Sequence, residues 1–200
     1  MTRPVSGPVV GPPERCAAVI LAAGGSSRFG PGAKQLAQLG GRPLVEIAVA
    51  AALEAGVFSA VAVVVGAVVL DAVLPSSVVV IDNPEWRTGQ ASSLQAGLVW
   101  ARAEGIDRVV VGLADQPGVT AEAWRRVATD PGPEPIVVAT YEGRRGNPVR
   151  LDASVWDLLP ADGDEGARAL IRRRPGLVGA VPCPGTMLDI DTLEDLDRWN

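Results

Sequence analysis

The sequence predicts an α/β protein: a single domain with three layers (α/β/α), in which helices cover both faces of a mostly parallel sheet. Unbroken apolar segments, typical of strands that are buried on both faces, recur along the chain. Segments with helix start and stop signals alternate with them. The chain has 200 residues, with neither an internal repeat nor a clear linker, so we expect one domain.

The first strand and the first helix flank a segment rich in glycine and serine. Residues 16–22 are all apolar and predict a buried strand, which the Gly/Ser segment 23–32 follows. Pro43 then begins an alanine-rich stretch that Gly56 ends, which is the usual placement of proline and glycine around a helix. Residues 60–65 predict the second strand.

The alternation continues through the rest of the chain. A strand is predicted over residues 78–81, then a helix over 90–104, where apolar residues recur at helical spacing. Residues 108–113 predict a fourth buried strand, and Thr120 is placed to cap a helix that runs to about residue 128. The elements expected after it are a strand at 136–140, an edge strand within 141–150, short helices at 153–159 and 165–173, a strand at 177–181, and a helix at 193–199 capped by Thr192.

Charge and residue usage exclude several classes of function. The chain has 18 basic and 23 acidic residues and a net charge of −5, whereas a general nucleic-acid binder needs a basic face. Two cysteines make neither a disulfide scaffold nor a four-ligand zinc site. The lack of histidine excludes Ser-His-Asp, Cys-His and histidine-ligated metal chemistry. An enzyme of this composition works with carboxylates, Lys, Arg, backbone amides or a hard metal ion.

The amino-terminal residues bear on location. Residues 1–14 are rich in proline and glycine and indicate a flexible leader ahead of a domain at residues 15–200. The leader lacks the apolar core of a signal peptide, and apolar runs such as 60–65 are too short to span a membrane. We therefore expect a cytoplasmic protein that binds neither membrane nor nucleic acid.

The Gly/Ser segment is the first candidate binding site. A glycine-rich loop that leaves a buried strand can turn backbone N–H groups toward an anion, and Arg28 and Lys34 would add positive charge. Lys34 is the only lysine among the 18 basic residues. The segment matches neither a P-loop nor the dinucleotide fingerprint, so an ordinary strand-to-helix turn is the alternative. In parallel sheets ligands bind at the carboxyl ends of the strands, where Ala22, Leu113 and Asp189 are expected to lie.

Short motifs of a recognisable kind run from about residue 17 to residue 198. They are Leu21-x-Ala23-Gly24-x-Ser26-x-Arg28-Phe29-Gly30 with Lys34, Asn83-Pro84-Glu85-Trp86, Leu113-Ala114-Asp115-Gln116-Pro117, Gly146-Asn147-Pro148-Val149, Gly163-Asp164-Glu165-Gly166-Ala167-Arg168 and Asp189-Ile190-Asp191-Thr192. Together they resemble the molybdenum cofactor cytidylyltransferases. The resemblance implies the Rossmann-like fold of the nucleotide-diphospho-sugar transferases.

The resemblance also implies roles for individual residues. Lys34 and Arg28 would neutralise phosphate charge during catalysis, and Asp115 with Asp191 would bind Mg²⁺, which prefers oxygen ligands. Asp115 is therefore implied both as a catalytic and as a metal-binding residue. The implied nucleotide site comprises Leu21, Ala22, Ala23, Gly24, Gly25, Ser26, Lys34, Gly89, Ser92 and Ser93, and the implied acceptor site comprises Asn147 and Arg168.

Several of these residues have simpler interpretations. Asp115 stands close before a proline, where aspartate commonly forms turns, and Asp191 also suits the start of the last helix. Ser92 and Ser93 also fit as polar residues of a first helical turn. Asp189 lies one face away from Asp191 in an extended segment and is the weaker metal candidate.

The function that these residues predict is Mg²⁺-dependent nucleotidyl transfer. By resemblance, CMP would pass from CTP to the molybdopterin–molybdenum cofactor with release of pyrophosphate, a reaction that needs no protein nucleophile. Asn147 stands where relatives often carry histidine. Transfer of a guanylyl or other nucleotide to a different phosphorylated acceptor is therefore an alternative. A third hypothesis is a non-catalytic carrier of nucleotide or pterin cofactor for a molybdoenzyme.

Overall fold

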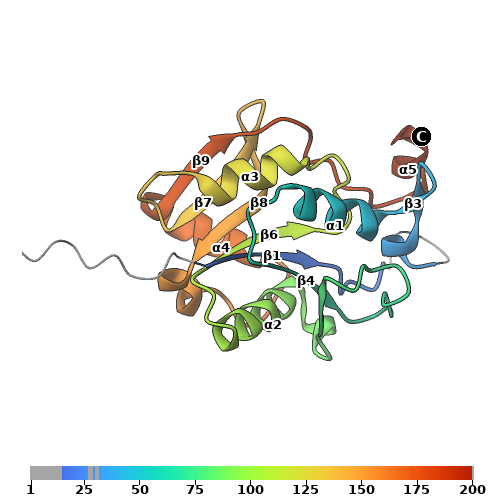
Figure 1. Ribbon diagram of the computed structural model, residues 1–200, viewed down its shortest axis with the longest axis horizontal. Helices are drawn as coiled ribbons and strands as arrows, with labels where there is room; N and C mark the ends of the chain where they lie inside the picture. Colours follow the sequence, from blue (N-terminus) through green and yellow to red (C-terminus); the bar gives the residue numbers. More distant parts are fainter. Residues whose placement is uncertain (1–14, 27–28, 30–31, 200) are drawn as a thin grey trace, which may run out of the picture.

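Seven strands form one mixed sheet in the order β5-β4-β1-β6-β8-β7-β9 (Figure 1). The computed structural model describes residues 15–26, 29 and 32–199, so the leader expected at 1–14 lies outside the described residues. Four neighbouring strands, from β5 to β6, run parallel, as the apolar runs predict. The strands are β1 Cys16–Leu21, β4 Ala60–Val65, β5 Val79–Asp82, β6 Arg108–Leu113, β7 Ile136–Tyr141, β8 Arg144–Asp152 and β9 Val178–Pro182.

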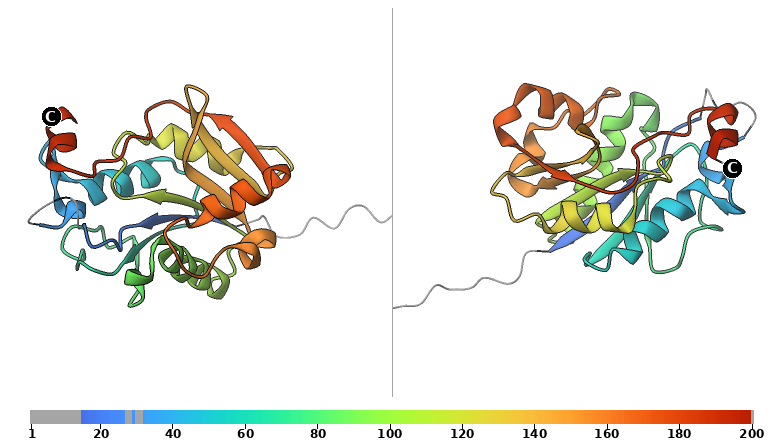
Figure 2. Two further views of the ribbon diagram at one scale, coloured as in Figure 1. Left: turned by 180° about the vertical axis from the view of Figure 1, so that it is seen from behind. Right: turned by 90° about the horizontal axis from the view of Figure 1, so that it is seen from above.

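Helices cover both faces of this sheet, which confirms the predicted three-layer architecture. α1 and α3 pack together on one face, and α2 and α4 pack on the other (Figures 1 and 2). The helices are α1 Leu44–Glu54, α2 Gln90–Ala103, α3 Ala121–Thr129, α4 Ala167–Arg173 and α5 Leu193–Trp199. Thr120 caps α3 as predicted, because its hydroxyl accepts from the N–H of Ala123 at 3.2 Å. None of the helices described here is both long and apolar enough to cross a membrane.

The structure corrects the prediction of an edge strand within residues 141–150. β8 lies inside the sheet, between β6 and β7, and runs antiparallel to both. Its register with β7 shifts between Val138 and Ala139, which pair with Val149 and Gly146. Asn147 and Pro148 therefore occupy a bulge, where a proline costs the ladder no hydrogen bond. From sequence alone, a proline in a short strand suggests an edge strand. The bulge allows this proline to lie in a strand inside the sheet.

Some short elements also differ from the prediction. Residues Ala153–Leu158 form a 3₁₀-helix, and α4 begins two residues later than expected, after Gly166 with its φ of +50°. A small hairpin of β2 (Gln38–Leu39) and β3 (Arg42–Pro43) was not predicted, because strands of two residues carry no readable period. Further 3₁₀-helices span Lys34–Leu36, Trp86–Thr88 and Pro175–Leu177.

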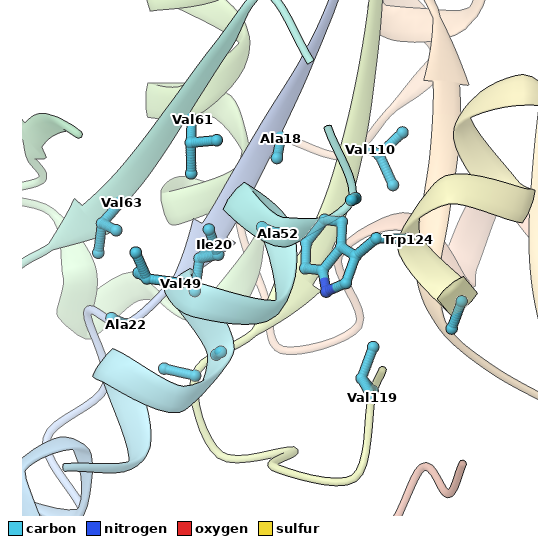
Figure 3. Packing of buried hydrophobic residues seen from close by; sticks show 14 of the residues in the cluster. Ala18, Ile20, Ala22, Val49, Ala52, Val61, Val63, Val110, Val119 and Trp124 are labelled. Atoms are coloured by element: carbon cyan, nitrogen blue, oxygen red, sulfur yellow. The ribbon is translucent and has the colours of Figure 1, made fainter. Parts of the chain in front are cut away.

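The core on the α1 and α3 side is built around Trp124. Figure 3 shows its indole in the layer that also holds Ala18 and Val110, from β1 and β6, and Val49 from α1. The ring is 1% exposed and meets Phe58 edge-to-face, with centroids 5.8 Å apart. This packing holds α1 and α3 against β1 and β6, and both strands end at the pocket described below.

A smaller apolar cluster anchors the carboxyl-terminal segment. Ile190 and Leu196 pack against Leu44 and Phe29, which places α5 beside the β2–β3 hairpin (Figures 1 and 2). The backbone N–H of Ile190 also donates to the carbonyl of Asp115 at 2.9 Å. The chain after β9 is thereby held against the carboxyl end of β6.

Cys16, at the start of β1, is expected to resist alkylation. Burial is the main reason that its pKa rises from 9.0 to about 12, against the opposing charges of Arg150 and Arg108. In the unfolded chain the thiol ionises near pH 9, so the free energy of unfolding should fall as pH rises from 9 towards 12. We expect iodoacetamide at pH 8 to modify Cys183 before Cys16, with both modified quickly in denaturant, as measured by mass spectrometry. Rapid modification of native Cys16 would contradict this.

Candidate functional site

A pocket of about 490 Å³ lies at the carboxyl ends of β1 and β6. In Figure 1 the arrows of β1 and β6 point toward the side of the molecule where α5 lies. Its walls are the glycine loop after β1, the start of α2, the residues after β6 and the segment before α5. The predicted site residues that line it are Leu21, Ala22, Ala23, Gly24, Gly25, Ser26, Lys34, Gly89, Ser93, Asp115 and Asp191.

Gln35, to which the sequence pattern assigned no role, supports the glycine loop through hydrogen bonds to its carbonyls. The buried Gln35 amide donates through Nε2 to the carbonyls of Ala22 and Gly24, at 2.9 and 2.6 Å, and its Oε1 accepts from the Ser26 hydroxyl. The N–H and C=O of a trans peptide point in opposite directions, so the N–H groups of Ala23 and Gly25 point away from Gln35. Among the described residues nothing accepts from them, and they are available to an anion.

Trp86 forms the other support of this loop. Its indole lies so close to Gly25 and Gly66 that a Cβ at either position would stand 2.8 Å from a ring carbon or its Cβ. The guanidinium of Arg87 lies over the same ring, 4.4 Å from its centroid. Gly25 is therefore required by close packing, and Trp86 contributes to the pocket wall.

Replacing Gly25 with alanine is expected to lower the free energy of unfolding by ~1–3 kcal/mol, the usual cost of overpacking. Gly24→Ala is the matched control, since a Cβ there meets nothing within 4 Å. Urea denaturation of the two variants measures the difference. Equal stabilities would mean that Trp86 moves aside freely.

Lys34 lies between two carboxylates at the base of the pocket. Its Nζ donates to Asp115 Oδ2 at 2.6 Å and to Asp191 Oδ1 at 2.8 Å. Burial opposes the charge of the ammonium, but the two carboxylates outweigh burial, so the pKa of Lys34 is raised. Lys34 is therefore a permanent cation at neutral pH, in a position where phosphate groups can reach it.

The two carboxylates fit a divalent cation. Asp115 Oδ1 is buried and makes no hydrogen bond to any described residue, while Asp115 Oδ2 and Asp191 Oδ1 both accept from the ammonium of Lys34. The described residues contain no group of three or more His, Cys, Asp or Glu side chains that could hold a metal by themselves. This is the donor set of Mg²⁺ sites that combine one or two carboxylates with substrate phosphates and water.

Asp191 does not cap α5, which was its alternative interpretation. The Thr192 hydroxyl accepts from the N–H of Asp195, and Asp195 Oδ2 accepts in return from the N–H of Thr192. Asp189 does not line the pocket, and its carboxylate accepts from Gln116 at 2.7 Å. Burial and the charge of Asp115 raise the pKa of Asp189.

Of the two predicted serines at the start of α2, one lines the pocket and the other does not. Asn83 is buried and donates through Nδ2 to the hydroxyl oxygens of Ser92 and Ser93, at 3.0 Å each. Ser93 lines the pocket, while Ser92 also contacts the carbonyl of Gly89 and lies outside the lining. Ser92 thus takes the position of a polar residue in a first helical turn, which was its alternative interpretation.

Gly89 marks the junction between α2 and the segment before α4. It has a φ of +112°, and a Cβ there would meet the backbone of Gly163 at 2.5 Å. The carbonyl of Gly163 accepts from the N–H of Ala91 at 2.9 Å. This contact brings Asp164 to the pocket wall, a residue to which the sequence analysis gave no separate role.

The two predicted acceptor residues lie together at a second hollow, of only about 30 Å³. Asn147 and Arg168 line it, and it shares Leu21, Gln90 and Leu113 with the larger pocket. The two hollows are therefore neighbours across the ends of β1 and β6. Arg28, predicted to act on phosphate, lies outside the described residues.

Comparison with known proteins assigns this architecture to a family. Residues 18–177 match the MobA-like NTP transferase domain. The chain is 34% identical over 195 residues to nicotine blue oxidoreductase of Paenarthrobacter nicotinovorans, covering 90% of this chain and 94% of that protein. It is 31% identical over 113 residues to purine catabolism protein PucB of Bacillus subtilis, covering 54% and 55%.

Solved structures agree with this assignment. Rv0371c from Mycobacterium tuberculosis superimposes with a TM-score of 0.78 at 26% identity, covering 92% of this chain and 97% of that one. A nucleotidyl transferase from Methanothermobacter, Mth528, gives a TM-score of 0.77 at 25% identity, covering 92% and 95%. Rv0371c has also been solved as a complex with manganese. The chain thus has the nucleotide-diphospho-sugar transferase fold and belongs to the MobA-like NTP transferase family, as a nucleotidyltransferase.

Proposed function

We propose that the protein transfers CMP from CTP to the molybdopterin–molybdenum cofactor, with Mg²⁺ and with release of pyrophosphate. The observation that carries this proposal is the convergence of Lys34, Asp115 and Asp191 beside a glycine loop whose N–H groups are available to phosphate. The family assignment supports nucleotidyl transfer. The resemblance of the motifs supports the choice of cytidylyl transfer and of a pterin acceptor, which stays a proposal.

The reaction requires positioning and charge neutralisation rather than a protein nucleophile. A phosphate oxygen of the acceptor forms a bond to the α-phosphorus, and the bond from the α-phosphorus to the bridging oxygen breaks, so that pyrophosphate leaves with its electron pair. The N–H groups of Ala23 and Gly25 would bind the triphosphate, and Lys34 would neutralise its charge.

Asp115 and Asp191 would hold the divalent ion, for which the unpartnered Oδ1 of Asp115 is a suitable ligand. When bound, Mg²⁺ neutralises phosphate charge. Asn147 and Arg168, which line the hollow beside the nucleotide pocket, would contact the acceptor.

Calorimetric titration with CTP, GTP, ATP and UTP, each with Mg²⁺, tests the donor half of this proposal without an acceptor. We expect CTP to bind at least about tenfold more tightly than the others, a difference of ~1.4 kcal/mol. Selective binding of GTP would keep the chemistry but replace the nucleotide. If no triphosphate binds to folded protein, the carrier hypothesis becomes the better one, and a molybdoenzyme partner should then be sought.

A second candidate reaction comes from the relative in Paenarthrobacter nicotinovorans, which is named an oxidoreductase and is 34% identical over 90% of this chain. The same pocket would then take part in the oxidation or reduction of nicotine blue. A change in the visible spectrum of nicotine blue that requires the protein would show this activity. Pyrophosphate release from CTP with molybdopterin, without such a change, would exclude it.

A further inference from the structure

A chain of hydrogen bonds through Gln116 connects the smaller hollow to the two segments that carry Asp115 and Asp191. Gln116 is 4% exposed and follows Asp115 directly. Its Nε2 donates to the carbonyl of Met187 at 3.0 Å and to Asp189 Oδ1 at 2.7 Å. Its Oε1 accepts from Nδ2 of Asn147 at 3.0 Å.

Elementary hydrogen-bond chemistry fixes the direction of this chain. The carbonyl of Met187 can only accept, so the amide nitrogen of Gln116 must face it and Oε1 must face Asn147. Asn147 must then use its nitrogen towards Gln116, because its own oxygen would stand against another acceptor. The backbone is held as well, since the Tyr141 hydroxyl donates to the carbonyl of Asn147 at 2.7 Å.

The neighbouring backbone leaves little room for rearrangement. Met187 packs on Gly146, where a Cβ would stand 2.6 Å from its Sδ. The segment that supplies the carbonyl for Gln116 therefore lies directly against the bulge that carries Asn147. Nδ2 of Asn147 is held by Gln116, while its Oδ1 makes no hydrogen bond to a described residue and belongs to a side chain that lines the smaller hollow.

We infer that Asn147 is a specificity-determining residue that presents Oδ1 as a fixed hydrogen-bond acceptor, and that Gln116 is the positioning residue that sets its orientation. The ligand class selected is a phosphorylated acceptor whose ring edge carries N–H donors, as a pterin does. A sugar phosphate offers hydroxyl groups, which both donate and accept, and it would gain less from a fixed amide orientation. This inference rests on the proposed function for its choice of substrate.

The test measures CMP transfer at saturating CTP with molybdopterin as the varied acceptor. Asn147→Ala removes Oδ1, the atom proposed to accept the hydrogen bond from the substrate. Gln116→Met keeps the size of the side chain but removes the hydrogen bond that orients Asn147. We expect each to raise the KM for molybdopterin about tenfold or more with kcat within about threefold, as the loss of one directed hydrogen bond does. Gln38→Met is the matched control, because Gln38 is exposed and its side chain, among the described residues, bonds to the carbonyl of Leu36 alone; it should behave as wild type.

A variant that combines Gln116→Met with Asn147→Ala shows whether Gln116 acts through Asn147 or independently of it. If Gln116 acts through Asn147, adding Gln116→Met to Asn147→Ala raises the KM no further. Multiplying effects, or an unchanged KM in Asn147→Ala, would overturn the inference. CTP binding by calorimetry should be unchanged in all variants, because the donor pocket does not include either residue.

A second readout keeps the inference separate from the proposed reaction. In ¹⁵N-labelled protein the side-chain NH₂ signal of Asn147, assigned by its loss in Asn147→Ala, should shift in Gln116→Met and stay in place in Gln38→Met. If molybdopterin is no substrate but this shift occurs, the proposed acceptor fails and the oriented amide stands. If the signal does not move, the orienting role of Gln116 is refuted, whatever the substrate.

Discussion

Asp115→Asn is expected to reduce nucleotidyl transfer by about 10²–10³-fold or more, the usual effect of removing a group aimed at transition-state charge. The amide keeps an oxygen for Lys34 but loses the charge, and one of its ends becomes a donor. Asp115 Oδ1 is buried without a described partner, so a nitrogen there would face the proposed cation directly. Steady-state pyrophosphate release with CTP and molybdopterin measures the loss.

The fold should survive this change. Asp115→Asn replaces one carboxylate oxygen with an NH₂ group of similar size, and the backbone carbonyl of residue 115 can still accept from the N–H of Ile190. Circular dichroism and thermal melting should therefore match wild type. Asp71→Asn is the control, because Asp71 is exposed and lies outside the pocket lining; it should retain full activity. A fully active Asp115→Asn variant would remove the carboxylate from the mechanism.

Lys34→Met is expected to change the affinities for nucleotide and for metal in opposite directions. Its ammonium is the charge that would meet the triphosphate, so CTP affinity should fall by about 10–100-fold, the range of one charge-assisted contact. In the absence of nucleotide the same ammonium neutralises Asp115 and Asp191. Removing it leaves two carboxylates without this cation, and Mn²⁺ should bind more tightly to the free variant than to free wild type.

Calorimetry with CTP and paramagnetic titration with Mn²⁺ measure the two effects of Lys34→Met separately. Lys34→Arg is the matched variant, since it keeps the charge but replaces a compact ammonium with a planar fork. It should retain weak Mn²⁺ binding and recover part of the CTP affinity. If Mn²⁺ affinity falls in Lys34→Met, the lysine does not compete with the cation, and the two carboxylates are not the metal site.

Local pattern was sufficient for the strands whose two faces are both buried. β4 and β6 have the predicted bounds, because an unbroken apolar run records burial on both sides wherever it occurs. Thr120 and Thr192 could also be predicted, since the capping hydrogen bond is made within the first turn of the helix. The position of β8 between β6 and β7 could not be predicted, because the residues of a strand do not specify which strands will pair with it.

Some residues of the candidate site could likewise be predicted from the sequence, and others could not. Lys34, Asp115 and Asp191 were singled out by residue type and by position after strands, and the structure brings all three within hydrogen-bond distance. Gln35 was missed, because a glutamine in a single 3₁₀ turn carries no local signal until the fold brings the carbonyls of Ala22 and Gly24 next to it.

Local sequence pattern was enough to predict the fold class, the alternation of strands and helices, and the residue types that can bind a nucleotide. These depend on hydrophobic periodicity and on capping, which act over a few neighbouring residues. Long-range packing, by contrast, places Lys34 between two carboxylates 81 and 157 residues away, and places Gln116 against Asn147, 31 residues away. Contacts of that span follow from the packing of the whole sheet, because the carboxyl ends of its strands meet only after every strand has found its neighbour.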